Sequence, residues 1–136
     1  MAQELIRLRK GHWQAMLEHV LRCLPDEACG LLGGEDGEVF LVRPVRNISR
    51  NPTRFRMDPG EQIKAMFEIE EKGHQIVAIY HSHPAGPDQP SEIDLLEAAY
   101  PEASYLIWYP SGREWNCHAF VMSPEGPEEI PIFLDE

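Results

Sequence analysis

The stretch that most constrains the fold is a continuous apolar run, QIVAIY, at residues 75–80. A strand-length run of apolar, β-branched residues without alternation is typical of a strand buried on both faces, inside a sheet that other elements cover. The run leads without a break into HSHP, so the strand delivers His81 and His83 at its end. The sequence therefore predicts a central strand whose end carries two imidazoles.

The segments around this strand predict a mixed α/β domain spanning residues 1–136. Strand patterns occur at residues 4–10, 28–34, 38–45, 104–110, 114–122 and 129–134, and the segment 47–57 predicts a loop that leads into a brief strand. Helical spacing predicts helices at 12–24, 58–73 and 91–100, each bounded by proline or glycine. We expect roughly seven strands and three helices, with a mixed central β-sheet flanked by helices.

Composition narrows the functional classes. The formal net charge of −11 over 136 residues repels phosphate backbones and anionic lipid, which argues against nucleic-acid and membrane partners. The chain contains no apolar run of the roughly 18 residues that a membrane span needs, and its N-terminus lacks the apolar core of a secretion signal. We therefore expect a cytoplasmic protein.

The three cysteines and the arginines give weaker signals. Cys23, Cys29 and Cys117 form no CxxC pair and are odd in number, which predicts reduced thiols that pack in the core. Five arginines fall within one short stretch: Arg43, Arg46, Arg50, Arg54 and Arg56. They form either a solvated loop or a stripe that receives an acidic surface or a terminal carboxylate.

The HSHP segment predicts a metal site. Residues i and i+2 of a strand point to the same side, so His81 and His83 can present both imidazoles to one ion. Asp94 follows in the first turn of the next helix, and its carboxylate can complete three protein ligands with an open fourth position. The same donor set occurs in iron oxygenases, but neighbouring histidines favour zinc.

A structural interpretation of Asp94 remains open beside the metal interpretation. Ser91 and Asp94 match the S-x-x-D capping pattern, in which Ser91 caps the helix and Asp94 bonds back to its amide. A hydrolytic centre also needs a general base and a donor for the developing oxyanion. Ser91 is the candidate donor, and Asp88, Glu92 and Glu27 are the candidate bases.

Two segments resemble a known family. HSHPAGPDQPSEID fits the signature H-x-H-P, six residues, S, two residues, D of the JAMM (MPN+) metalloproteases, and PDEACGLLGG is similar to that family's upstream glutamate segment. Only short segments separate LLGG from NPTRF and Asp94 from SYLIWY, which resembles the short prokaryotic members rather than the eukaryotic deubiquitinases with their two insertions. The resemblance implies an MPN/JAB1 domain with a cytidine-deaminase-like α/β fold.

The resemblance also implies site residues and an activity. Zn²⁺ would be held by His81, His83 and Asp94, with a water as fourth ligand activated by Glu27, while Ser91 stabilises the tetrahedral intermediate. The implied reaction is hydrolysis of a peptide or isopeptide bond after the C-terminal Gly-Gly of a ubiquitin-like or sulfur carrier protein. Asn47 and the arginines are candidates for holding that tail.

Two alternatives remain. The chain could be a non-catalytic MPN-type binding module or scaffold for a ubiquitin-like partner. A metal-dependent oxygenase or deaminase would need an iron site or a nucleobase pocket, and the sequence signals neither. The histidines without a ligand-spaced partner are expected to be solvated or packed in the core: His12, His19, His74 and His118.

Overall fold

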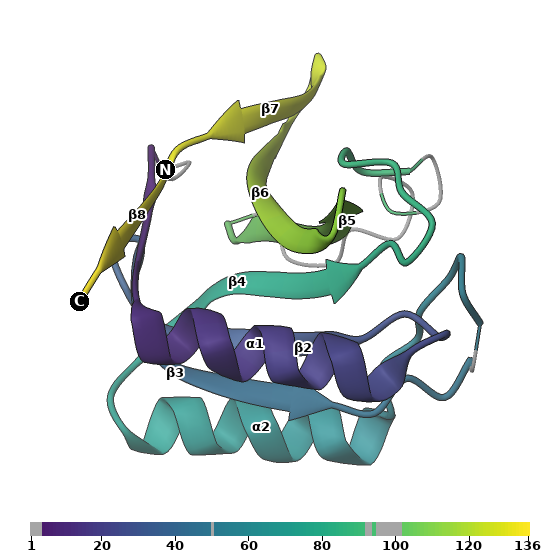
Figure 1. The fold of residues 1–136 in the computed structure, drawn as a ribbon. Coiled ribbons are helices and arrows are strands. Elements are labelled where there is room, and N and C mark those ends of the chain that lie inside the picture. The colour runs from purple at the N-terminus through teal and green to yellow at the C-terminus, as the bar shows by residue number, and fades with distance from the viewer. Residues whose placement is uncertain (1–3, 50, 92–93, 95–101) are drawn as a thin grey trace.

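The computed structural model describes residues 4–49, 51–91, 94 and 102–136, which form a strongly curved mixed sheet with helices against it (Figure 1). The strands are β1 (Ile6–Arg9), β2 (Cys29–Glu35), β3 (Glu38–Val45), β4 (Gln75–Ser82), β5 (Ser104–Ser111), β6 (Glu114–Ser123), β7 (Gly126–Ile130) and β8 (Ile132–Asp135), and the helices are α1 (Lys10–Cys23) and α2 (Pro59–Glu71). The eight strands lie in the order β7-β6-β5-β4-β2-β3-β1-β8.

Local sequence sets the ends of both helices. Asp58 caps α2, because its Oδ1 accepts hydrogen bonds from the amides of Gly60 and Glu61, and Pro59 occupies the first helical position. Gly73 follows α2 with a φ of +77°, a conformation that favours glycine. Helix α1 ends at Cys23, just before Pro25, as the sequence predicts.

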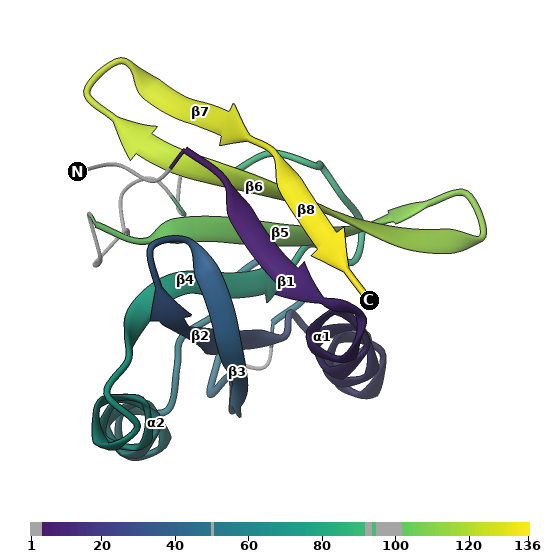
Figure 2. The ribbon, with the colours of Figure 1, turned by 90° about the vertical axis from the view of Figure 1, so that its left-hand side faces the viewer.

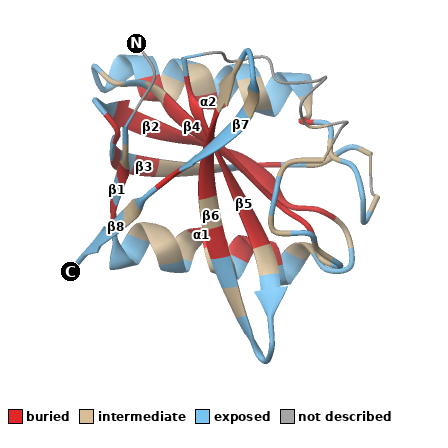
Figure 3. Cartoon of the chain, turned by 90° about the horizontal axis from the view of Figure 1, so that it is seen from above, coloured by how far each residue is buried: buried red, intermediate tan, exposed pale blue. Residues whose placement is uncertain are grey.

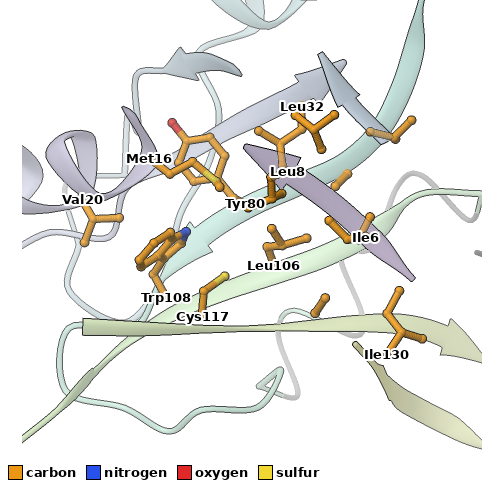
Figure 4. Packing of buried hydrophobic residues seen from close by; sticks show 14 of the residues in the cluster. Ile6, Leu8, Met16, Val20, Leu32, Tyr80, Leu106, Trp108, Cys117 and Ile130 are labelled. Carbon is orange, nitrogen blue, oxygen red and sulfur yellow. The ribbon is translucent and has the colours of Figure 1, made fainter. Parts of the chain in front are cut away.

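Helices α1 and α2 lie on opposite sides of β2 and β3 (Figure 2), and buried residues concentrate on the central strands (Figure 3). Two apolar clusters pack against these helices. Strand β2 feeds both of them, because Leu32 belongs to the cluster on the α1 side and Leu31 to the cluster on the α2 side. Figure 4 shows Met16 of α1 close to Tyr80 of β4 and Trp108 of β5. The strand predicted to be buried on both faces is β4, and its burial confirms that prediction.

The C-terminal strand pattern, residues 129–134, is divided between two strands. Residues up to Ile130 belong to β7, which pairs antiparallel with β6, whereas β8 pairs parallel with β1. Pro131 separates them because it has no N–H to donate to a ladder, although its carbonyl accepts the amide of Ile6 at 3.0 Å. One predicted strand is therefore two, which pair with strands at opposite ends of the sheet order.

Two other predictions have partial outcomes. The brief strand expected within residues 47–57 is a single bridge between Asn47 and Met57. The predicted helix 91–100 lies mostly outside the described residues, although Asp94 itself is helical. The three cysteines are free thiols, two of them buried. Within the described residues, neither helix has the length and apolarity to cross a membrane.

The close approach of β2 to a tyrosine ring generates a stability prediction. A Cβ added at Gly30 would lie 2.3 Å from the ring of Tyr80, which is fully buried and whose hydroxyl is bonded to His19. We expect Gly30→Ala to lower the free energy of unfolding by about 1–3 kcal/mol in urea titrations. Gly11→Ala is the control, because nothing lies within 4 Å of its Cβ and alanine favours a helix; it should be neutral or stabilising. Equal effects of both substitutions would contradict this explanation.

Candidate metal centre

The end of β4 places both histidines at the centre of the sheet. The amide of His83 donates to the carbonyl of Trp108 on β5 at 2.8 Å, so the strand pairing holds the chain through this residue. His81 and His83 are 1% and 4% exposed, and Phe55 stacks on the ring of His81 with 4.7 Å between ring centroids. Nδ1 of His83 lies 2.8 Å from the carbonyl oxygen of Pro87. When Nδ1–H donates to this oxygen, Nε2 keeps a free lone pair.

Three ligand atoms converge on one point. The Nε2 atoms of His81 and His83 lie 3.1 Å apart, and Oδ2 of Asp94 lies 3.1 Å from the first and 3.0 Å from the second. A tetrahedral ion with bonds of about 2.0–2.1 Å separates its ligand atoms by about 3.3 Å. The three atoms therefore already lie close to the spacing that a zinc-sized ion requires.

Asp94 satisfies both interpretations of the S-x-x-D pattern. The amide of Ser91 donates to Oδ2 of Asp94 at 2.8 Å, and the amide of Asp94 donates to Oγ of Ser91 at 3.1 Å, which is a reciprocal capping box. The same Oδ2 atom faces both imidazoles. The cap is thus what aims this carboxylate at the histidines.

Glu27 is the second carboxylate at this site. Its side chain is 1% exposed, and a carboxylate oxygen lies within 4.8 Å of a ring nitrogen of both His81 and His83. These three residues form a possible ligand group by themselves. Oδ2 of Asp94 lies 3.1 and 3.0 Å from Nε2 of the same two rings, so either carboxylate is placed to act as a third ligand. Within the described part of the chain, Oε1 of Glu27 has no hydrogen-bond partner.

The segment that carries Glu27 is joined directly to β4. The amide of Ser82 donates to the carbonyl of Ala28 at 3.0 Å, and the amide of Ala28 donates to Oγ of Ser82 at 2.8 Å. Because Ser82 lies between the two histidines and Ala28 follows Glu27, these bonds fix the backbone of the Glu27 segment relative to the imidazoles. Ser82 was not predicted, because its only signal in the sequence is its position between the histidines.

Burial and charge shift the titration of the site in opposite directions. Burial raises the pKa of Glu27 to about 8, although the charge of His83 opposes the shift. For Asp94, burial acts to raise the pKa, but the hydrogen bonds from His81 and His83 outweigh it and hold the pKa well below its usual range. Burial lowers the pKa of His81, which favours the neutral ring that binds metals.

Asp88 and Glu92 were the other candidate bases. The carboxylate of Asp88 points to β6, where it lies 3.5 Å from Nδ1 of His118, and Glu92 lies outside the described residues. His118, which was expected to be solvated or packed in the core, also contacts the hydroxyl of Tyr109 at 3.0 Å. These partners come from distant parts of the sequence, so no local pattern reveals them.

The four described arginines of the 43–56 stretch fall into two groups. Arg43 pairs with Glu68, and Arg46 pairs with Asp58 at 2.6 Å, so both join β3 to α2 and its cap. Arg54 and Arg56 line a separate cleft with Ser49 and Asn51. Arg50 lies outside the described residues.

The fold and the site together define an α/β domain with a candidate mononuclear metal centre. Residues 9–118 match the family described as prokaryotic homologs of the JAB domain. The chain therefore belongs to this family, which agrees with the resemblance to JAMM proteins and with the expected MPN/JAB1 fold.

Individual relatives agree with this assignment. The chain is 42% identical to a "CysO-cysteine peptidase" of Mycobacterium tuberculosis over 95 residues, or 68% of this chain and 65% of that protein, slightly less than two thirds of its length. It is 40% identical to a "Probable TtuB-protein conjugate cleaving protease" of Thermus thermophilus, over 92% of this chain and 80% of the relative. The solution structure of protein DSY2949 from Desulfitobacterium hafniense superposes with a TM-score of 0.87 at 38% identity, covering 96% of this chain and 93% of that one.

The buried Glu27 generates a prediction for the metal-free protein. Because its pKa rises from about 4.5 when unfolded to about 8 when folded, the folded state binds the extra proton between these values, and stability falls as the pH rises through them. Glu27→Gln removes this penalty. We expect it to raise the thermal midpoint of the metal-free protein by roughly 3–6 °C at pH 8 and much less at pH 5. The exposed Glu114→Gln is the control, and equal shifts for Glu27→Gln at both pH values would contradict the prediction.

Proposed function

We propose that the chain is a zinc-dependent hydrolase that cleaves the peptide or isopeptide bond after the C-terminal Gly-Gly of a ubiquitin-like or sulfur carrier protein. The observation that carries this proposal is the convergence of His81, His83 and Asp94 beside the buried carboxylate of Glu27. The names of the two relatives support the substrate class, because one denotes a peptidase and the other a protease of protein conjugates.

The donor set fits zinc, with Nε2 of His81, Nε2 of His83 and Oδ2 of Asp94 as ligands. Bound zinc supplies a Lewis acid that lowers the pKa of water to about 7 and polarises a carbonyl. The positive charge of such an ion would also stabilise ionised Glu27 and so lower its raised pKa into the range of a working base.

Glu27 and Ser91 then carry out the proton transfer and the charge stabilisation. The carboxylate of Glu27 takes a proton from the attacking water and gives it to the leaving amine, and its unpartnered Oε1 is free to accept that proton. The Oγ atom of Ser91 accepts the amide of Asp94, so its own hydroxyl hydrogen can donate to the developing oxyanion. A cap and an oxyanion donor are compatible roles for one serine.

Cleavage of a carrier-protein fusion tests the proposal. We expect the zinc-loaded protein to cut a ubiquitin-like carrier extended beyond its Gly-Gly, with the products identified by mass, and a chelator to abolish the cut. Glu27→Gln should lower kcat by about 10²–10⁴-fold and still bind about one zinc per chain. Intact zinc binding without cleavage of any such fusion would contradict the proposal and favour a scaffold.

The outer face of α2 is a candidate surface for the body of the partner. Ile63 and Phe67 lie one turn apart and are 53% and 62% exposed, which is unusual for two adjacent large apolar side chains. Helix α2 begins where the loop beside Glu27 ends, at the cap residue Asp58. A partner whose tail reaches the metal centre can therefore rest its folded part on this helix.

Substitution of Phe67 tests whether α2 contributes to binding of the partner's folded part, measured by KM, without affecting the cleavage step, measured by kcat. We expect Phe67→Ala to raise KM for the carrier fusion about 5–20-fold, because burial of a phenyl ring on binding contributes about 1–2 kcal/mol, and to leave kcat unchanged. A short peptide ending in the same Gly-Gly extension should be cut with unchanged KM. Phe133→Ala, on the distant strand β8 and 47% exposed, is the matched control; an equal rise in KM there would contradict a specific surface on α2.

A further inference from the structure

The side-chain amide of Asn47 makes four hydrogen bonds. Its Nδ2 donates to the carbonyls of Glu27 at 2.9 Å and Arg54 at 3.2 Å, and its Oδ1 accepts the amides of Ser49 and Arg56, each at 2.9 Å. Both donor hydrogens and both acceptor sites of the amide are therefore committed. The expectation that Asn47 holds the substrate tail is wrong for its side chain, which has no hydrogen-bonding capacity left.

We propose that Asn47 is a positioning residue that fixes the peptide of Glu27 and the arginine-bearing loop in one arrangement; this inference rests on the proposed role of Glu27 as the base. Oε1 of Glu27 has no partner among the described residues, so hydrogen bonds to this atom do not hold the carboxylate in place. The backbone of Glu27 is held on both sides: its amide donates to the carbonyl of Asn51 at 3.0 Å, and its carbonyl accepts Asn47.

The other half of the Asn47 amide holds the loop that lines the neighbouring cleft. Four residues line this cleft, and the Asn47 amide forms hydrogen bonds with the backbone of three of them: Ser49, Arg54 and Arg56. The same amide therefore joins the wall of this cleft to the base. An error of about 1 Å in placing a catalytic group can lower the rate about 10²-fold. The joint formed by the four hydrogen bonds of Asn47 therefore affects the turnover rate rather than metal binding.

Two substitutions remove different numbers of the Asn47 hydrogen bonds. In Asn47→Asp, one carboxylate oxygen still accepts Ser49 and Arg56, while the other faces two carbonyl oxygens without a hydrogen to donate. Asn47→Ala removes all four bonds without adding charge. We expect both variants to lower kcat for the carrier fusion at least tenfold, with KM within threefold for Asn47→Asp, whose loop bonds persist.

Metal binding distinguishes positioning from a general loss of structure. Zinc stoichiometry, zinc affinity and the absorption spectrum of the cobalt-substituted protein should equal those of the wild type, because the four hydrogen bonds of Asn47 within the described part of the chain reach none of His81, His83 and Asp94. Asn116→Asp is the matched control, since its exposed side chain also accepts a backbone amide, that of Cys117, on β6, two strands away from β4. It should leave kcat and KM unchanged.

Specific outcomes would overturn the inference. A rise in KM with unchanged kcat would make Asn47 a binding residue, and a loss of zinc affinity would make it merely structural. If both variants fail to fold, the wild type provides the test by NMR: the Asn47 side-chain amide protons should exchange slowly with solvent, and fast exchange would refute the joint. If the wild type itself cuts no fusion, the proposed function fails, while the exchange measurement still decides whether the joint exists.

Discussion

The reciprocal pair of hydrogen bonds between Ala28 and Ser82 is the constraint on which the rest of the site depends. It joins the start of β2 to the end of β4, where the strands pair with Cys29 opposite His81. Glu27 immediately precedes this junction, His81 lies on β4 and His83 directly follows it, so the carboxylate faces the two imidazoles across paired backbone. The relative position of these three side chains is thus set by the sheet, whereas Asp94 comes from the segment that follows it.

The buried site contains two groups that favour the neutral form and one that favours the charged form. Burial keeps a proton on Glu27 and keeps His81 neutral, whereas the hydrogen bonds to Asp94 stabilise its charge. Such a cluster is costly to fold because buried polar groups lack full compensation. A divalent cation would offset that cost, since it attracts both carboxylates and accepts the lone pairs of both rings. The cost of folding this cluster without an ion and its suitability for a cation would then have the same origin.

Much of this arrangement was predictable because it is encoded locally. The apolar run of β4, the cap at Asp58 and the spacing of His81, His83 and Asp94 each depend on residues near one another in the chain. Long-range partners were not predictable. The chain itself gives no sign that the amide of Asn47 would bond to Glu27, or that Pro131 would divide the last strand pattern between two ends of the sheet. These features depend on which strands become neighbours, and a pattern within one segment does not contain that information.

The parallel pairing of β1 with β8 has a consequence for biosynthesis. Ile6 pairs with Ile132, and Lys10 bonds to Glu136, so partners 126 positions apart must meet. Until β8 has been synthesised, the edge of β1 that pairs with it stays open, and an exposed strand edge is a template for wrong pairing. The sheet is therefore complete only once residues 132–135 have been made, and until then the open edge of β1 exposes the nascent protein to aggregation.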